Sequence, residues 1–168
     1  VRISSCHAPC TRWRFAPDDT GAEPPSPAWL LTEAGTERKA GVWVIAGDPL
    51  DSPPLDDLGP DADQVSLAEL ADLLAQSPNQ RVHGFLRDQH LIAGIGRMLA
   101  NEICHRAKLS PFTMTAKLTE GQITALHGAI GSCIADALAH ERTLPAMSRS
   151  AERPGAVHRR KGAECPEC

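Results

Sequence analysis

Two glycines, Gly94 and Gly96, stand directly before a run that has the pattern of an amphipathic helix. Glycine adopts positive φ angles and lets another molecule approach the backbone closely. The first amides of a helix have no partner within the helix and lie at the positive end of its dipole. Because Arg97 follows directly and Arg87 and Lys108 are near in the sequence, this helix start is predicted to bind a phosphate of a nucleic-acid backbone.

The same two glycines also suit a tight turn where two helices cross, and the pattern alone leaves this alternative open. A site for a nucleotide cofactor is not indicated, because no strand precedes the glycines and the third glycine of such motifs is absent. If the glycines do form a phosphate site, we expect Gly96 to occupy a turn that needs a positive φ.

Cysteines at the end of the sequence suggest a second kind of chemistry. Cys165 and Cys168 have the spacing that places two thiolates on one metal ion, but a closed structural zinc site needs four ligands. His158 and the cluster formed by Cys6, His7 and Cys10 are candidates for the others. The expectation is that zinc is not stably bound, and that Cys165 and Cys168 are free thiols.

Helical patterns occupy the part of the chain that must position these residues. Ser66 and Glu69 form the pattern of a capping box, a short helix fits residues 80–87, and another fits residues 97–107. Thr119 and Gln122 form a second capping box. It opens the clearest helix, whose apolar face is expected to consist of Ile123, Leu126, Ile130, Cys133, Ile134, Ala137 and Leu138. The buried faces are expected to hold Cys104 and Cys133 as packing residues.

Residues 1–45 have the character of strands, with short apolar runs at residues 28–32 and 41–45. Residues 14–28 are rich in Pro, Gly and Asp and are predicted to be a loop. Since a lone hairpin is marginally stable, this segment is interpreted as the remnant of a larger β-domain. The sequence thus predicts an α+β fold with a Pro- and Asp-rich linker at residues 46–65, a helical domain at residues 66–142 and a basic tail at residues 143–168.

The net charge of −4 conceals a strong segregation of charge. Residues 46–80 carry eight acids and no Lys or Arg, whereas residues 81–117 carry six bases and two acids and residues 142–162 six bases and one acid. This pattern favours one cationic face that attracts a polyanion. No stretch approaches the roughly 20 apolar residues of a membrane span, and the start lacks the apolar core of a signal peptide. A soluble, cytoplasmic protein without a membrane partner is expected.

The sequence "FLRDQHLIAGIGRMLANEICHRAKLSPF" (residues 85–112) resembles the helix-two-turns-helix of the formamidopyrimidine-DNA glycosylase and endonuclease VIII family. The matching positions are Leu86, Asp88, Gln89, Gly94, Gly96, Glu102, Arg106, Ala107 and Pro111. Residues 31–45 are similar to the last strands of the family's β-sandwich, residues 58–62 to its interdomain connection, and residues 158–168 to the opening of its zinc finger. The resemblance implies a base-excision-repair protein that binds double-stranded, damaged DNA.

Departures from the family pattern concern both catalysis and binding. The family attacks C1′ of the damaged nucleoside with an N-terminal proline amine aided by a glutamate, whereas this sequence begins with Val1 and Arg2. The family's phosphate-contacting Asn is Arg97 here, and a family Lys is His83. The resemblance therefore implies DNA contacts by Gly94, Gly96, Arg97, Glu102, His83, Arg87 and Lys108, a metal pair of Cys165 and Cys168, and no catalytic residue among these 168 positions.

Three hypotheses about function follow. The first is a DNA-binding relative of the family without glycosylase or abasic-site lyase activity. The second is an active glycosylase and lyase, as part of a longer product or with an unorthodox nucleophile such as Lys39 or Lys108. The third is a helical interaction module whose glycines serve packing only.

Overall fold

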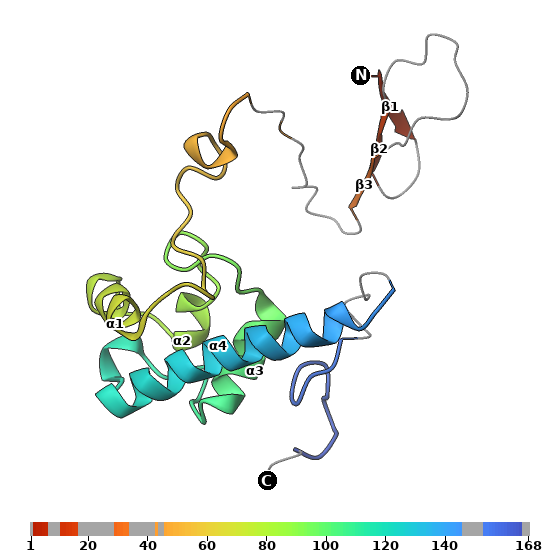
Figure 1. The fold of residues 1–168 in the computed structure, drawn as a ribbon. Helices are drawn as coiled ribbons and strands as arrows, with labels where there is room; N and C mark the ends of the chain where they lie inside the picture. Colours follow the sequence, from red (N-terminus) through yellow and green to blue (C-terminus); the bar gives the residue numbers. More distant parts are fainter. Residues whose placement is uncertain are drawn as a thin grey trace. The chain divides into compact units, whose positions relative to one another are not determined.

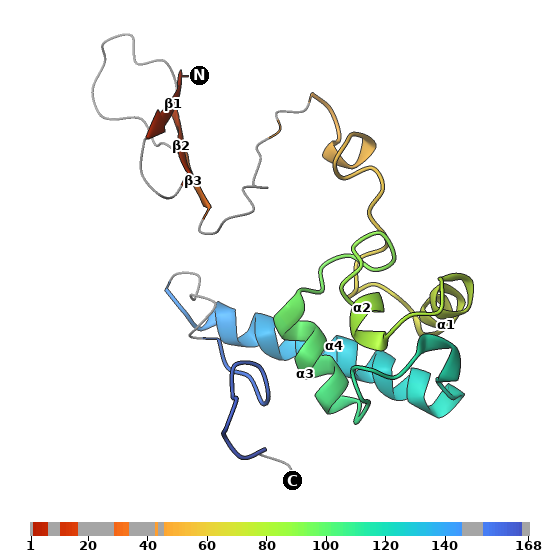
Figure 2. The same ribbon diagram turned by 180° about the vertical axis from the view of Figure 1, so that it is seen from behind.

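The computed structural model describes residues 2–6, 11–16, 29–33, 43, 46–145 and 153–165. The chain divides into two compact units, Val1–Ala46 and Gly47–Cys168. The first unit contains the strands and the second contains the helices (Figures 1 and 2).

The first unit is a three-stranded antiparallel sheet of β1 (Arg2–Cys6), β2 (Thr11–Ala16) and β3 (Trp29–Glu33), in the order β1-β2-β3. Strand β3 confirms the strand expected at residues 28–32. Residues 41–45, the other expected strand, lie outside the described residues except for Trp43, which belongs to no strand and is 59% exposed.

The prediction of a loop from residue 14 onward is wrong for its first three residues, which close β2. Polar and apolar residues alternate over residues 12–15 (Arg-Trp-Arg-Phe), and this period of two is the signature of a strand. Pro17 directly follows the strand, and the Pro-rich composition after it masked the alternation.

The second unit is helical. Its elements are η1 (Pro49–Asp51), α1 (Leu67–Gln76), α2 (Val82–Phe85), α3 (Arg97–Arg106), η2 (Thr115–Lys117) and α4 (Glu120–Arg142). Both expected capping boxes are present, at the starts of α1 and α4. Each satisfies backbone amides that a helix leaves without partners at its first turn.

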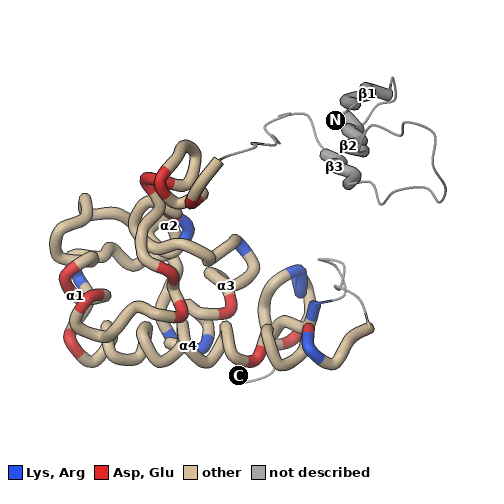
Figure 3. Tube along the Cα trace, turned by 45° about the horizontal axis from the view of Figure 1, so that its top comes forward, with Lys and Arg blue, Asp and Glu red and all other residues tan. Residues whose placement is uncertain are grey.

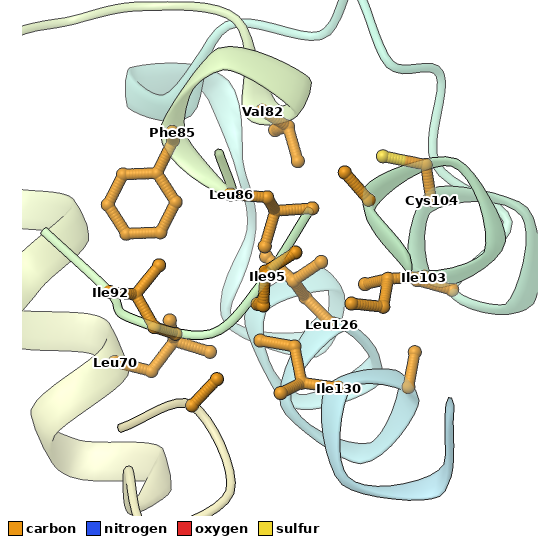
Figure 4. Packing of buried hydrophobic residues seen from close by; sticks show 14 of the residues in the cluster. Leu70, Val82, Phe85, Leu86, Ile92, Ile95, Ile103, Cys104, Leu126 and Ile130 are labelled. Carbon is orange, nitrogen blue, oxygen red and sulfur yellow. The ribbon is translucent and has the colours of Figure 1, made fainter. Parts of the chain in front are cut away.

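Four helices of this unit enclose one apolar core (Figure 4). Fully buried side chains come from every helix and from the loop before α3, and they include Leu70, Val82, Phe85, Leu86, Ile92, Ile95, Ile103, Cys104, Leu126 and Ile130. The packing role expected for Cys104 and Cys133 is confirmed. Burial raises the pKa of the Cys104 thiol to about 11, so this thiol stays protonated and unreactive at neutral pH.

The linker expected at residues 46–65 contributes to this core through its last residues. Ala62 and Val65 are buried, and the Ala62 amide donates to the Ala93 carbonyl at 3.0 Å. The end of the linker therefore helps to hold the loop before α3 in place.

Helix α4 extends past the core at its C-terminal end. Leu126, Ala129, Ile130 and Cys133 are buried, whereas Leu138 is 45% exposed. The expected apolar face was therefore wrong at Leu138, since the last turns of α4 line an open groove instead of the core. Among the described residues, no helix combines the length and apolar character needed to cross a bilayer.

Candidate nucleic-acid interface

Helix α3 begins at an exposed glycine. Gly96 is its N-cap residue, with φ −93° and ψ 178°, and no side chain caps the helix there. Arg97, the first helical residue, is exposed as well. The first amides of α3 thus lie at the positive end of the helix beside an accessible guanidinium, an arrangement suited to an anion.

The turn before α3 is held by the side chain of Gln89. Its Oε1 accepts a hydrogen bond from the Gly94 amide at 2.9 Å, while its Nε2 donates to the Ile95 carbonyl at 3.0 Å and to the Arg87 carbonyl at 3.1 Å. Ile95, between the two glycines, is 1% exposed and anchors the turn in the core. One polar side chain and one apolar side chain therefore fix the position of the α3 start.

The two glycines have different backbone roles. Gly94 has φ +93°, a conformation that residues with a Cβ rarely adopt. Gly96 has an extended backbone, and a Cβ added there would meet no atom within 4 Å. The expectation that Gly96 needs a positive φ was therefore wrong, because the left-handed turn comes two residues earlier.

Other basic residues expected at the site are spread over the helical unit. Arg87 is exposed in the turn after α2. Lys108 is exposed beyond the C-terminus of α3, roughly 16 Å from Arg97 at about 1.5 Å per residue along the helix. Arg106 donates to the Asp136 carboxylate at 2.7 Å. The Nε2 atom of His83 is buried and has no hydrogen-bond partner among the described residues.

Glu102, which was expected to contact DNA, binds protein backbone. Its carboxylate accepts hydrogen bonds from the amides of Ala156 at 2.7 Å, Val157 at 3.1 Å and His158 at 2.8 Å. A carboxylate with three N–H donors is stabilised where it lies. The structure therefore places Glu102 between α3 and the segment that leads to Cys165.

The candidate metal ligands are only partly brought together. Cys168 lies outside the described residues, and the Sγ atom of Cys165 is 3.3 Å from His105 Nε2. His158, which was considered as a ligand, places its Nδ1 2.9 Å from Asn101 Nδ2. Within the described part of the chain, no three His, Cys, Asp or Glu side chains form a metal site. The described residues alone therefore do not supply the four ligands of a structural zinc.

An open groove of about 880 Å³ lies between α3, the end of α4 and residues 153–156. Gly94 and Gly96 are among its lining residues. Two arginines of the lining, Arg106 and Arg153, are paired with acids, and the lining acids are Asp61, Asp63, Glu102, Asp136 and Glu141. The remaining excess of carboxylates disfavours a phosphate inside the groove. An anion at the start of α3 is therefore expected on the side of Arg97, which does not line the groove.

The sequence placed Gln89 in the motif but did not predict its hydrogen bonds to the turn, nor the contacts of Asn101, Glu102 and His105 with the C-terminal segment. Gln89 accepts a hydrogen bond from the amide of Gly94, five residues later. The sequence showed that both residues belong to the motif, but not that they are bonded to each other. The other three residues contact positions more than 50 residues away, which periodicity within one helix does not reveal.

Comparison with known proteins identifies this helical unit. Residues 58–148 match the family model described as the formamidopyrimidine-DNA glycosylase H2TH domain. A formamidopyrimidine-DNA glycosylase-like protein of Mycobacterium tuberculosis is 44% identical over 115 residues, which are 66% of this chain and 71% of that protein. A formamidopyrimidine-DNA glycosylase of Chloroflexus aurantiacus is 36% identical over 100 residues, 55% of this chain and 36% of the enzyme.

Solved structures agree on the fold. The crystal structure of the MutM (Fpg) protein of Thermus thermophilus matches with a TM-score of 0.62 and 26% identity, over 99% of this chain and 70% of that one. A complex of Lactococcus lactis Fpg with DNA containing an abasic site matches with a TM-score of 0.55 and 21% identity, over 77% of this chain and 54% of that one.

The share of each relative that is matched differs widely. The chain spans most of the Mycobacterium tuberculosis relative, but only about a third of the Chloroflexus aurantiacus enzyme. The family model, in contrast, covers more than half of this chain and all of α1 to α4. The chain therefore belongs to the formamidopyrimidine-DNA glycosylase family.

Proposed function

We propose that this protein binds duplex DNA through the phosphate backbone, with the start of α3 as the primary contact. The observation that carries the proposal is the exposed, uncapped Gly96 followed directly by an exposed Arg97. A phosphate at this point accepts hydrogen bonds from the first helix amides and from the guanidinium, both of which would otherwise face water.

Two kinds of evidence support DNA as the source of that phosphate. Related Fpg structures hold DNA, one with an abasic site and one with an N7-benzyl-Fapy-dG lesion. The charge distribution agrees, because Arg87, Arg97 and Lys108 are exposed and the C-terminal segment of residues 153–165 carries several basic residues (Figure 3). Phosphate contacts carry no sequence information, so binding should be weak, salt-dependent and largely independent of sequence.

The proposal extends to two further parts of the chain, the strands and the C-terminal tail. Strands β1 to β3 are interpreted as part of the family's β-sandwich, and residues 143–168 as a basic tail that opens a zinc finger.

Arg97→Ala tests the phosphate site. The side chain is exposed, so the variant should fold as the parent does, while losing a charge-assisted hydrogen bond of about 1–3 kcal/mol. The slope of log affinity against log salt should become shallower by about one. Fluorescence anisotropy with a labelled duplex at several salt concentrations measures both quantities.

Lys117→Ala is the matched control, since Lys117 is an exposed cation on η2, which packs against α1. This variant also removes one positive charge, but at a position away from the start of α3. It should therefore change the affinity for DNA little. If Arg97→Ala binds DNA like the parent, the phosphate site is refuted and a helical interaction module becomes the better account.

A further inference from the structure

Three neighbouring residues of α3 hold the C-terminal segment of residues 153–165. Glu102 accepts from the amides of residues 156–158, Asn101 contacts His158, and His105 contacts Cys165. At the other end of the segment, Arg153 Nε lies 2.9 Å from Glu141 Oε1 of α4. The backbone of this segment is therefore fixed mainly by one face of α3.

The contact with Glu102 depends on close approach. An added Cβ at Gly155 would lie 2.9 Å from Glu102 Oε1, closer than real Cβ atoms come to a neighbour. Gly155 thus leaves room for the carboxylate to reach three successive amides. Because all of its hydrogen bonds go to backbone and its charge repels phosphate, Glu102 is poorly suited to touch DNA directly.

The segment held in this way presents a run of three exposed cations, Arg159, Arg160 and Lys161. They directly follow His158, the last residue that Glu102 holds. Arg159 has φ +61°, an uncommon conformation for a residue other than glycine. The chain thus turns sharply at the point where the cations begin, and the three side chains remain in solvent.

We propose that residues 159–161 form a second phosphate-binding surface and that Glu102 is the residue that positions it. This inference rests on the proposed function, because it assigns a further part of the chain to the same DNA. The partner is the phosphate backbone of a duplex, to which three adjacent cations are complementary in charge.

The shared helix explains why such an arrangement is useful. The first turn of α3 carries the phosphate site at Gly96 and Arg97, and the following turns carry Asn101, Glu102 and His105. A single rigid element therefore sets the distance between the two cationic surfaces before DNA arrives. Preorganisation of this kind lowers the entropy lost when the complex forms.

The first experiment neutralises the surface with the combined variant Arg159→Ser, Arg160→Ser and Lys161→Ser. Affinity for a 20-base-pair duplex at about 0.1 M salt should fall by about tenfold or more, and the salt slope should become shallower by about two to three. The control is Arg81→Ser with Lys117→Ser, two exposed cations next to η2, which should have a much smaller effect per charge.

The second experiment removes the positioning carboxylate with Glu102→Gln, in which the amide nitrogen cannot accept a hydrogen bond. DNA affinity should fall although the variant has lost a negative charge that repels phosphate. A purely electrostatic effect would raise affinity, so the sign of the change separates the two explanations. Asp72→Asn, at an exposed acid of α1, is the matched control and should leave affinity equal or slightly higher.

Combining Glu102→Gln with the serine variant tests whether the two act together. If Glu102 works by positioning residues 159–161, the combination should bind hardly more weakly than the serine variant alone. Amide hydrogen exchange at residues 156–158 should accelerate in Glu102→Gln and stay unchanged in the serine variant.

Two results overturn the inference. One is a serine variant with the affinity and salt slope of the parent while Arg97→Ala still weakens binding. The other is a fully additive loss in the combined variant, which would mean that Glu102 acts elsewhere. A parent chain that binds no DNA, or an Arg97→Ala variant with unchanged binding, would instead refute the proposed function itself. The serine variant alters only exposed side chains, so its result stands even if Glu102→Gln fails to fold.

Discussion

Gly94 and Gly96 are alike in sequence but differ in what the backbone requires of them. At Gly94 the φ of +93° excludes a Cβ without strain, whereas at Gly96 the extended N-cap conformation accepts any residue and there is space for a side chain. The conformational requirement thus lies at Gly94, whereas Gly96 leaves the first amides of α3 accessible.

Substitution separates these two needs. Gly94→Ala should lower the free energy of unfolding by about 1–2 kcal/mol, because it forces a Cβ into the left-handed region. Gly96→Ser should keep or slightly raise that free energy, since serine is a good N-cap, while its hydroxyl competes for the amides proposed to bind phosphate and weakens DNA binding. Thermal melting and fluorescence anisotropy measure the two effects, and a strongly destabilised Gly96→Ser would contradict the assignment.

Lys108 shows a similar requirement at the other end of α3. It has φ +54°, and the Leu109 amide donates to the Cys104 carbonyl at 2.9 Å while the Lys108 amide donates to the His105 carbonyl at 3.0 Å. This is the pattern of a Schellman motif, in which glycine is the preferred residue.

Lys108→Gly should therefore raise the free energy of unfolding by about 0.5–1 kcal/mol, as relief of left-handed strain outweighs the added freedom of the unfolded chain. Urea denaturation measures the change. Lys108→Ala removes the same charge without freeing the backbone, so an equal gain in that control would show that charge, and not backbone strain, is the cause.

At the scale of single elements, sequence predicted the helices better than the strands. The capping boxes at Ser66 and Thr119 placed the starts of α1 and α4 correctly because caps are local hydrogen bonds between residues three apart. The first strand and the end of β2 were missed although their partners are near in sequence, because short strands have no local hydrogen bonds of the capping kind and the Pro-rich composition after Ala16 masked the alternation in β2. The exposed end of α4 was missed because the apolar periodicity of this helix continues beyond the residues that pack against it.

The α1 capping box also gives a dependence on pH. Ser66 donates to Glu69 from both its amide and its hydroxyl, at 2.8 and 2.7 Å, and these bonds lower the pKa of the Glu69 carboxyl from its ordinary value of 4.5. A lowered pKa in the folded state stabilises α1 above pH 4.5, and this contribution is lost as the pH falls through the folded-state pKa.

NMR titration of the Glu69 carboxyl should show this lowered pKa. In Ser66→Ala the hydroxyl bond is gone, so the pKa should move back toward its ordinary value and the melting temperature should decrease at neutral pH. The difference in melting temperature between the parent and Ser66→Ala should shrink in acid. A difference that stays constant down to about pH 3 would mean that the Glu69 carboxylate plays no part in the cap.

At the scale of the whole molecule, the family and the α3 motif could be predicted from sequence, whereas the connection between distant segments could not. The resemblance identified Gly94, Gly96 and Arg97 by their spacing. It assigned Glu102 to DNA, while the structure shows that carboxylate bonded to residues 156–158. Spacing within one motif locates a residue on its helix, but which segment packs against that helix depends on the folding of the whole unit.

Base excision is a property of the whole molecule, because it needs a nucleophilic amine in addition to a DNA-binding surface. The chemistry that the family resemblance implies uses a terminal secondary amine, and in a preparation of residues 1–168 the first residue is Val1 while Pro9 and Pro17 have amide nitrogens that are not nucleophilic. We expect such a preparation to bind abasic-site DNA in anisotropy measurements without forming a covalent adduct in the presence of borohydride. A family glycosylase assayed in parallel should give the trapped band, which controls for the substrate. A trapped band with residues 1–168 would instead show that another amine attacks C1′, and its loss in Lys39→Ala or Lys108→Ala would identify that amine.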